Sequence, residues 1–248
     1  MIDCAVILAA GRGTRLGKQG TMAPKGFLRL GDKPIIEESL LRLQRAGIRR
    51  AVIVTGHLVH FYEELAARSG GPIEIPIETV HNPRYADSGS MYSLSLAKNK
   101  LLGDFLLLES DLIYEQRALA HTLNYPEDNL VLLSGATGSG DEVYVETKPW
   151  KGLQRLVDMS KERRRLGENI AGELVGISKI SRSVLRVMLE KAEDHFRETL
   201  MMDYETDALV AAGREIPVYC DRVDDLLWAE IDDAAHWERA RTEIYPGL

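Results

Sequence analysis

The sequence is short of cysteine, of long apolar runs and of net positive charge. Only two of its residues are cysteines, and Cys4 and Cys220 offer neither a metal-site spacing nor a disulfide framework. No segment approaches the roughly 20 apolar residues of a membrane span. The chain also enters its first predicted strand at once, which argues against a signal peptide or an anchor. We therefore expect a cytoplasmic protein with no membrane partner.

The charge and the length of the chain limit its partners and its organisation. Aspartate and glutamate number 38 against 31 lysines and arginines, which gives a net charge of −7. A main partner made of nucleic acid would need a basic surface, so the sequence argues against it. At 248 residues the chain is long enough for one large α/β domain, and its composition marks no linker or internal repeat. We expect a single domain over residues 1–248.

A short apolar run at the start of the chain leads into a glycine-rich loop. Residues 5–8 are continuously apolar, which is typical of a central parallel strand covered on both faces. In α/β sheets, ligands bind at the carboxyl ends of such strands. Glycines let backbone N–H groups approach phosphate oxygens and cations add positive charge, so this loop predicts a polyanionic ligand. Its glycines are Gly11, Gly13 and Gly17, and its cations are Arg12, Arg15, Lys18 and Lys25.

Two common glycine motifs do not fit this loop. A P-loop needs a longer spacing before its Gly-Lys pair than the one between Gly13 and Gly17. A dinucleotide fingerprint needs a glycine where this chain has Leu16. The loop therefore belongs to neither type.

Strand-like and helix-like segments alternate through the first half of the chain. Such alternation favours right-handed βαβ crossovers and a mostly parallel sheet with helices on both faces. The second half is less regular and predicts a smaller, mixed β region with hairpins. The expected strands after the first are 51–54, 73–80, 105–109, 130–134, 142–147, 153–159, 174–178 and 216–221. The expected helices are 34–46, 59–68, 90–98, 116–123, 181–200, 207–213 and 234–244.

Carboxylates stand at two positions that suit a metal ion. Asp111 ends the apolar run 105–111, which places it at the same sheet edge as the glycine loop; alternatively it caps the next turn or helix. Glu230 and Asp232 share one face if their segment is extended, and two carboxylates on one face otherwise repel each other. Asp233 is expected to be the N-cap of the terminal helix. Mg²⁺ prefers one or two carboxylates together with phosphates and water.

The glycine loop resembles the L-A-A-G-x-G-T-R-L…P-K motif of nucleoside-triphosphate transferases, and the E-I-D pattern before the terminal helix is similar to the same superfamily. The resemblance implies a Rossmann-like nucleotide-diphospho-sugar transferase fold. It also implies that Arg15, Lys25 and Asp111 are catalytic, and that Asp111, Glu230 and Asp232 hold Mg²⁺. The implied nucleotide-binding residues of the loop and its strand are Leu8, Ala9, Ala10, Gly11, Gly13, Thr14, Arg15 and Lys25, together with Asp111.

Two segments in the middle of the chain indicate a particular group within this superfamily. Residues 81–85 and 88–94 resemble the N-P-x-Y…Y-S-L stretch of small cytidylyltransferases that act on phosphocholine or 2-aminoethylphosphonate. The resemblance implies that Ser88, Gly89 and Ser90 lie beside the nucleotide, where the N–H groups at the helix start could approach it. The relatives often carry asparagine at the positions of Ser88 or Ser90, so direct base or ribose contacts stay open. A simple helix cap is the alternative.

The segment 204–207 resembles the aromatic and acidic segment that these cytidylyltransferases place near the amine of their substrate. Glu205 and Asp207 could pair with an ammonium group, and Tyr204 or Trp228 could offer a ring face. Lys161 resembles a lysine that holds the phosphate or phosphonate of the acceptor. An acid at a helix start is also common for electrostatic reasons alone.

These expectations lead to a cytidylyltransferase that transfers CMP from CTP to a small phosphonate or phosphorylated amino alcohol, with release of pyrophosphate. Residues 1–125 would bind the nucleotide, and residues 126–248 would bind the acceptor and complete the metal site. Aromatic residues make up only 6% of the chain, which favours a primary amine over a trimethylammonium group. A sugar-1-phosphate nucleotidyltransferase and a non-catalytic nucleotide-binding module are the alternatives. The oligomeric state stays open, although an exposed helix face could support a homodimer.

Overall fold

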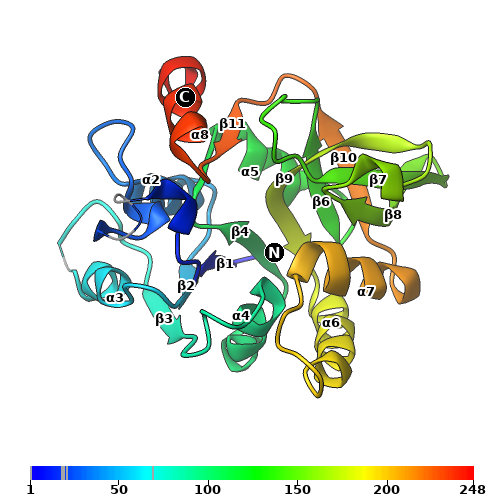
Figure 1. Cartoon of the computed structure of the whole chain (residues 1–248), viewed down its shortest axis with the longest axis horizontal. Helices are drawn as coiled ribbons and strands as arrows, with labels where there is room; N and C mark the ends of the chain where they lie inside the picture. Colours follow the sequence, from blue (N-terminus) through cyan, green and yellow to red (C-terminus); the bar gives the residue numbers. More distant parts are fainter. Residues whose placement is uncertain (1, 18–19, 21, 69) are drawn as a thin grey trace.

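A computed structural model describes residues 2–17, 20, 22–68 and 70–248, so Lys18 lies outside the described residues. The described chain forms a nine-stranded sheet in the order β3-β2-β1-β4-β9-β6-β10-β8-β7, and a two-stranded sheet of β5 and β11 (Figure 1). The strands are β1 (Cys4–Ala9), β2 (Arg50–Thr55), β3 (Ile77–His81), β4 (Phe105–Glu109), β5 (Leu112–Tyr114), β6 (Leu130–Ser134), β7 (Tyr144–Trp150), β8 (Leu153–Ser160), β9 (Ile170–Ile180), β10 (Tyr219–Val223) and β11 (Trp228–Glu230).

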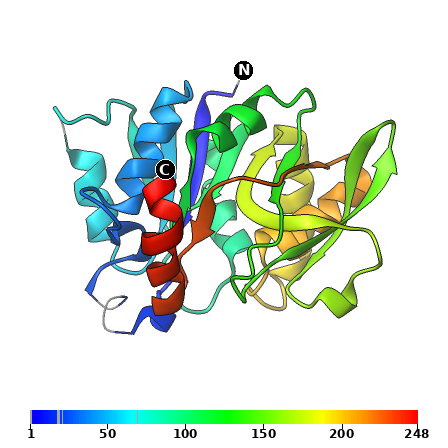
Figure 2. The same cartoon turned by 90° about the horizontal axis from the view of Figure 1, so that it is seen from above.

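Helices cover both faces of the large sheet, as the two views of Figures 1 and 2 show. Alternate residues of β1 point to opposite faces: Val6 packs in one core with α4 and α6, and Ile7 packs in the other with α2, α3 and α5. The predicted Rossmann-like α/β fold class is therefore confirmed. The helices are α2 (Ile35–Arg45), α3 (His60–Ala67), α4 (Ser90–Leu96), α5 (Gln116–Asn124), α6 (Arg182–His195), α7 (Val210–Glu215) and α8 (Ala234–Arg239).

The sheet is parallel in its first half and mixed in its second. Strands β3, β2, β1 and β4 pair in parallel, as the alternation of strands and helices predicts. Strand β9 then inserts antiparallel between β4 and β6, and β7 and β8 form an antiparallel hairpin at the far edge. Strand β9 thereby joins the two halves of the chain in one sheet.

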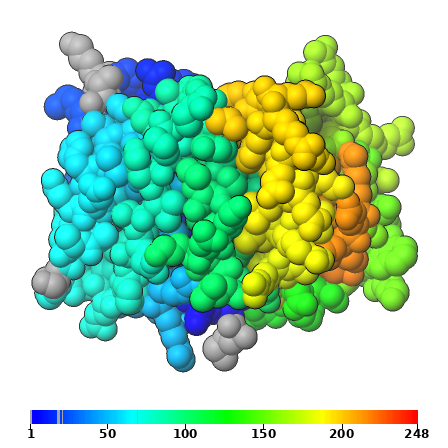
Figure 3. Space-filling view, turned by 90° about the horizontal axis from the view of Figure 1, so that it is seen from below, coloured from blue at the N-terminus to red at the C-terminus, as the bar shows by residue number. Residues whose placement is uncertain are grey.

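Several predicted element bounds are wrong, for identifiable reasons. The strand expected at 73–80 begins only at Ile77. Pro76 lacks the N–H that a ladder needs, and the N–H groups of Glu74 and Ile75 donate to Gln44 Oε1 instead. The helix expected at 181–200 ends at His195, and Phe196 packs against Tyr92 of α4 with ring centroids 5.4 Å apart. Figure 3 shows α4 and α6 side by side on this face.

Other differences lie in the second half of the chain. Strands β7 and β9 are longer than expected, and β10 lies further along the chain than the predicted strand 216–221. The helix expected at 207–213 is a π-helical turn, Tyr204–Leu209, followed by α7. The helix expected at 234–244 ends as α-helix at Arg239 and continues as a π-helical turn. Strands β5 and β11 were missed. No helix among the described residues is long and apolar enough to cross a membrane.

Candidate active site

The carboxyl ends of β1 and β4 form the edge at which the predicted site residues meet. The two strands are parallel neighbours, and Leu8 pairs with Glu109. The glycine loop leaves β1 and Asp111 follows β4, so both lie at one edge of the sheet, as predicted. Leu8 and Ala9 are buried within β1, which leaves their backbone as the part that could contact a ligand.

The glycine loop turns through a backbone conformation that glycine favours. Gly13 has φ 62° and Gly17 has φ 58°, values that an L side chain strains to adopt. Between them, Leu16 N–H donates to Gly13 O at 3.1 Å and closes the short helix Thr14–Leu16. Gly11, Thr14 and Arg15 are exposed, so this loop presents backbone and a cation at the surface.

Lys25 reaches the sheet edge because its neighbour packs closely against the chain beyond β4. A Cβ at Gly26 would lie only 3.0 Å from Ser110 O, so glycine permits this approach. Lys25 Nζ donates to Asp111 Oδ2 at 2.7 Å and also to Asp232 Oδ1. The side chains of these three residues are at most 16% exposed. One cation is therefore shared by two buried carboxylates.

The two-stranded sheet brings the distant acidic segment to the same place. Strand β11 pairs antiparallel with β5, with Glu230 opposite Leu112, and Ile231 N–H donates to Asp111 O at 3.1 Å. Residues 230–232 are thereby fixed beside the residues that follow β4. Ile231 is fully buried, as the period-two pattern predicts. Asp233 caps α8 by accepting the N–H of His236 at 2.8 Å, which agrees with its predicted role.

The carboxylate cluster differs from the predicted metal set. Among the described residues, oxygens of Glu109, Asp111 and Glu230 lie within 4.8 Å of one another. Asp232 is outside this group; it shares Lys25 with Asp111 and also pairs with Arg15 at 3.0 Å. Glu109 was missed, although it stands two residues before Asp111 at a strand end. The period-two rule that paired Glu230 with Asp232 would have paired these two as well.

Burial and mutual repulsion raise the pKa values of this cluster. Burial, followed by the charges of Asp111 and Asp232, raises the pKa of Glu230 to about 8. Burial, with the charges of Glu205, Asp111 and Glu230, raises the pKa of Glu109 well above its usual value. Burial also opposes the charge of Lys25, but Asp111 and Asp232 outweigh it and raise the pKa of the ammonium group. The site therefore disfavours the charged forms of Glu109 and Glu230, which keep their protons near neutral pH unless a cation binds beside them.

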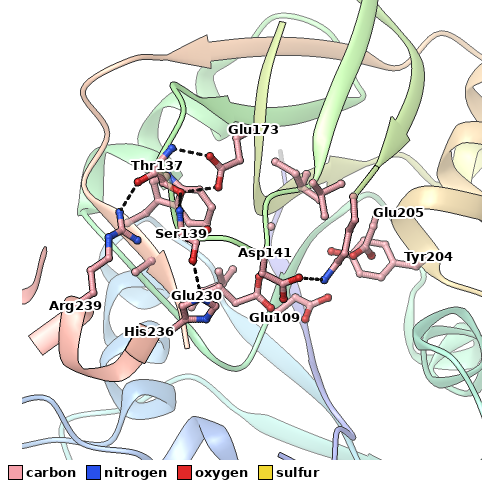
Figure 4. A pocket seen from close by; sticks show the side chains of 17 residues that line it. Glu109, Thr137, Ser139, Asp141, Glu173, Tyr204, Glu205, Glu230, His236 and Arg239 are labelled. Carbon is pink, nitrogen blue, oxygen red and sulfur yellow. Dashed lines mark hydrogen bonds and ion pairs between the residues drawn. The ribbon is translucent and has the colours of Figure 1, made fainter. Parts of the chain in front are cut away.

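A cavity of about 60 Å³ opens beside this cluster (Figure 4). Four of the residues predicted to bind the acceptor line it, namely Lys161, Tyr204, Glu205 and Trp228. Asp207 does not line it, because this side chain is exposed and accepts the N–H of Asp203 at 2.9 Å. Burial, and next the charge of Asp203, raise the pKa of Glu205 to about 7.

Unpaired polar atoms gather in this cavity. Seven buried side-chain atoms in the described part of the chain have no hydrogen-bond partner, and four belong to residues that line the cavity. An unpaired buried polar atom costs about 1–3 kcal/mol, so this concentration suits a polar guest. The four atoms are Tyr204 Oη, Glu205 Oε2, Trp228 Nε1 and His236 Nδ1.

Sequence reasoning missed the other wall of the cavity. Thr137 donates to Glu173 from both its N–H and its hydroxyl, each at 2.8 Å. His236 Nε2 lies 3.1 Å from Ser139 O, and Figure 4 shows these contacts at the end of the cavity away from Glu205. The segment 135–143 has no periodic pattern, and its cavity-lining role depends on contacts with β9 and α8.

The segment 88–90 starts α4 and is held by the chain around residue 202. Gly89 N–H donates to Leu200 O at 2.9 Å, and Met91 N–H donates to Met202 O at 3.0 Å. The N–H of Met91, in the first turn of the helix, is therefore already paired within the chain and is not free for a nucleotide. Ser90 Oγ accepts the N–H of Tyr204 at 2.9 Å, which ties the predicted nucleotide and acceptor segments together.

Comparison with protein families and curated proteins gives specific relatives. Residues 5–172 match the model of the MobA-like NTP transferase domain. The chain is 28% identical over 246 residues to a CMP-5'-(3-aminopropyl)phosphonate synthase of Streptomyces rubellomurinus, covering 98% of this chain and 39% of the relative. It is 34% identical over 103 residues to a choline-phosphate cytidylyltransferase of Streptococcus pneumoniae, covering 42% of each. The matched regions thus span about two fifths of these relatives.

Solved structures share the fold over the whole chain. An inositol-1-phosphate CTP transferase from T. maritima has a TM-score of 0.77 and 19% identity, covering 100% of this chain and 98% of that one. A UDP-glucose pyrophosphorylase complexed with UDP-glucose has a TM-score of 0.80 and 16% identity, covering 100% of both chains. At such identities these likenesses establish the architecture, which is that of nucleotidyltransferases.

Proposed function

Since the chain belongs to the MobA-like NTP transferase family and is similar to phosphonate and phosphocholine cytidylyltransferases, we propose that it transfers CMP from CTP to a small phosphonate or phosphorylated amino alcohol. Pyrophosphate is the other product. Residues 1–125 bind the nucleotide in this proposal, and residues 126–248 bind the acceptor.

The observation that carries the proposal is the excess of carboxylates beside the glycine loop. In the described part of the chain, six carboxyl groups surround the sheet edge and three cationic side chains pair with them. Burial and mutual repulsion raise the pKa values of Glu109, Glu205 and Glu230. A divalent cation and an ammonium group would stabilise the charged forms of these side chains. The carboxylates are Glu109, Asp111, Asp141, Glu205, Glu230 and Asp232, and the cations are Arg15, Lys25 and Lys161.

The carboxylate cluster fits Mg²⁺. Its donors are oxygens, as Mg²⁺ requires, and the raised pKa of Glu230 reflects charge that a divalent ion would neutralise. We assign Asp111, Glu230 and Glu109 as its ligands, so that Glu109 takes the place of the predicted Asp232. When bound, Mg²⁺ would neutralise phosphate charge and favour displacement at phosphorus.

The protein groups then have distinct tasks in the transfer. A phosphonate or phosphate oxygen of the acceptor attacks the α-phosphorus of CTP, a new P–O bond forms, and the bond to the β-phosphate oxygen breaks. The attacking oxygen is already anionic near neutral pH, so no general base is needed. Arg15 and Lys25 offset charge on the triphosphate, and the glycine loop aligns it.

The acceptor lies in the cavity in this proposal. Lys161 pairs with its phosphonate or phosphate group, and Glu205 offers an unpaired buried oxygen to its amine. A primary ammonium group can donate hydrogen bonds to this oxygen, whereas a trimethylammonium group cannot. We therefore favour an aminophosphonate over phosphocholine.

The test is pyrophosphate release with Mg²⁺, in which the four common nucleoside triphosphates are each combined with a set of acceptors. The set contains 2-aminoethylphosphonate, 3-aminopropylphosphonate, phosphoethanolamine, phosphocholine and glucose-1-phosphate. We expect turnover with CTP and an amine-bearing acceptor. Turnover confined to glucose-1-phosphate with UTP or dTTP would replace the proposal by a sugar-phosphate nucleotidyltransferase. Absence of turnover and of CTP binding would remove it.

A further inference from the structure

Asp141 lies between the parts of the site assigned to the two substrates. It belongs to the segment 135–143, which connects β6 to β7. Its Oδ2 accepts from Arg15 at 2.9 Å, and its Oδ1 accepts from Lys161 at 2.7 Å. Arg15 comes from the glycine loop and Lys161 follows β8, so one carboxylate joins two segments that are far apart in sequence. The dashed line at Asp141 in Figure 4 marks the contact with Lys161.

Arg15 and Lys161 favour the charged form of Asp141. Burial alone would raise its pKa, but hydrogen bonds involving Asp232, Lys161 and Arg15 outweigh burial and hold the pKa below its usual range. The two cations remain about half exposed, at 55% for Arg15 and 56% for Lys161. Their free sides therefore face solvent, from which a phosphate group could reach them.

The backbone around Asp141 is held firmly on both sides but not at its centre. Thr137 is bound by Glu173 and Ser139 by His236 on one side, and Leu174 N–H donates to Val143 O at 2.9 Å on the other. Within the described chain, residues 140–142 make no backbone hydrogen bond to another element. The side-chain contacts of Asp141 with Arg15, Lys161 and Asp232 are therefore the main restraint on this short stretch.

We propose that the Asp141 carboxylate occupies the place of substrate phosphate in the free protein. It pairs with Arg15 and Lys161 there, and it is displaced when CTP and the acceptor bind. The inference rests on the proposed function, because that function assigns Arg15 to the triphosphate and Lys161 to the acceptor phosphonate. A carboxylate that stayed between two phosphate groups would repel both. The binding free energy of the first substrate is therefore reduced by the free energy needed to move Asp141. The second substrate finds Asp141 already moved and binds more tightly.

Asp141→Asn tests this exchange, because asparagine keeps the shape and removes the charge. We expect calorimetric titration with CTP, without acceptor and hence without turnover, to give a Kd about three- to tenfold lower than the wild type. Titration with 2-aminoethylphosphonate alone should show a decrease of the same kind. Initial rates with both substrates varied should lose the dependence of each KM on the other substrate.

Glu142→Gln is the matched control. It removes one negative charge from the neighbouring residue, whose carboxylate accepts a local bond from the Gly140 N–H at 3.2 Å and no other bond from a described residue. The Kd values of this variant should therefore equal those of the wild type. If the wild type binds CTP and the Asp141→Asn variant binds it equally or more weakly, the inference is overturned and the proposed function stays intact. A wild type that neither binds CTP nor turns over any acceptor removes both.

Discussion

Lys25 lies between two buried carboxylates, and this arrangement determines what a change at Asp111 should do. Asparagine has the shape of aspartate, and its amide oxygen can still accept the bond that Lys25 donates at 2.7 Å. Lys25 also keeps its contact with Asp232. We expect Asp111→Asn to unfold within a few degrees of the wild type, while turnover falls about 100-fold or more because a cluster charge is lost. Pyrophosphate release and thermal unfolding measure the two effects.

The control for Asp111→Asn is Asp221→Asn. It removes a carboxylate that pairs with His121 at 2.8 Å, outside the lining of the cavity. Its turnover should match the wild type. Unchanged turnover in Asp111→Asn would take Asp111 out of the proposed metal site.

Glu205 and Asp207 offer a matched pair of carboxylates two residues apart. The pKa of Glu205 is raised to about 7 by burial and next by Asp203, so the side chain gains its charge as the pH rises through neutrality. We expect kcat/KM for an aminophosphonate to rise through this range more steeply in the wild type than in Glu205→Gln. The variant should also raise the KM of the amine about tenfold or more, because an ionic hydrogen bond is lost.

Asp207→Asn should leave the KM of the acceptor unchanged, because Asp207 is exposed and lies outside the cavity lining. The phosphonate group of the acceptor also gains charge near neutral pH, which by itself changes kcat/KM. The effect of Glu205 is therefore the difference between the pH profiles of the wild type and the two variants. Equal KM values in Glu205→Gln and the wild type would show that the amine lies elsewhere.

At the scale of secondary structure, the elements that form the sheet edge differ in how far sequence predicts them. Strand β4 is a buried apolar run, and its bounds were predicted correctly because burial on both faces leaves a continuous pattern. Strands β5 and β11 have three residues each, too few for any periodicity. Their pairing nevertheless places Glu230 beside Asp111. The resemblance of the E-I-D segment to nucleoside-triphosphate transferases indicated this contact, which periodicity could not.

The residues of the site divide in the same way. Those next to a strong local pattern, such as Asp111 at the end of β4, could be predicted. Asp141 could not be, because its segment lacks a period and its importance comes from Arg15 and Lys161, which are distant in sequence. Glu109 is an intermediate case, since the strand pattern contains it but the prediction placed the metal ligand at Asp111, where the run ends.

The start of α4 is clamped against the chain that leads to Tyr204 and Glu205. A Cβ at Gly89 would lie 2.3 Å from Met202 O and 2.6 Å from Met202 N, whereas its φ of −84° is ordinary. The constraint is therefore steric and involves backbone atoms. We expect Gly89→Ala to lower the free energy of unfolding by about 1–3 kcal/mol and to raise the KM of the acceptor, because residues 202–205 must shift. Chemical denaturation and initial rates measure these effects.

Gly103→Ala is the control for Gly89→Ala, because an added Cβ there meets nothing within 4 Å. Its stability and kinetics should equal those of the wild type. A Gly89→Ala protein as stable as the wild type would mean that the chain near Met202 yields without cost, and that α4 does not position the acceptor segment.

At the scale of the whole molecule, the carboxylate cluster links stability to pH. Burial, and next Asp111 and Asp232, raise the pKa of Glu230 from 4.5 to about 8 in the folded state, and that of Glu109 is raised as well. Between these pH values the folded protein keeps protons that the unfolded chain has already released. Stability therefore falls as the pH rises through this window, because the unfolded state binds fewer protons.

We expect the metal-free protein to unfold at a lower temperature at about pH 8.5 than at about pH 6. Mg²⁺ should raise the unfolding temperature more at the higher pH, because ionised carboxylates bind it and protonated ones do not. Calorimetric scans at both pH values, with Mg²⁺ and with a chelator, measure this difference. Glu230→Gln should reduce both the pH dependence and the effect of Mg²⁺. Two results would contradict the assignment of this cluster as the metal site. One is an unfolding temperature of the metal-free protein that is higher at about pH 8.5 than at about pH 6, and the other is a Mg²⁺ effect of equal size at both pH values.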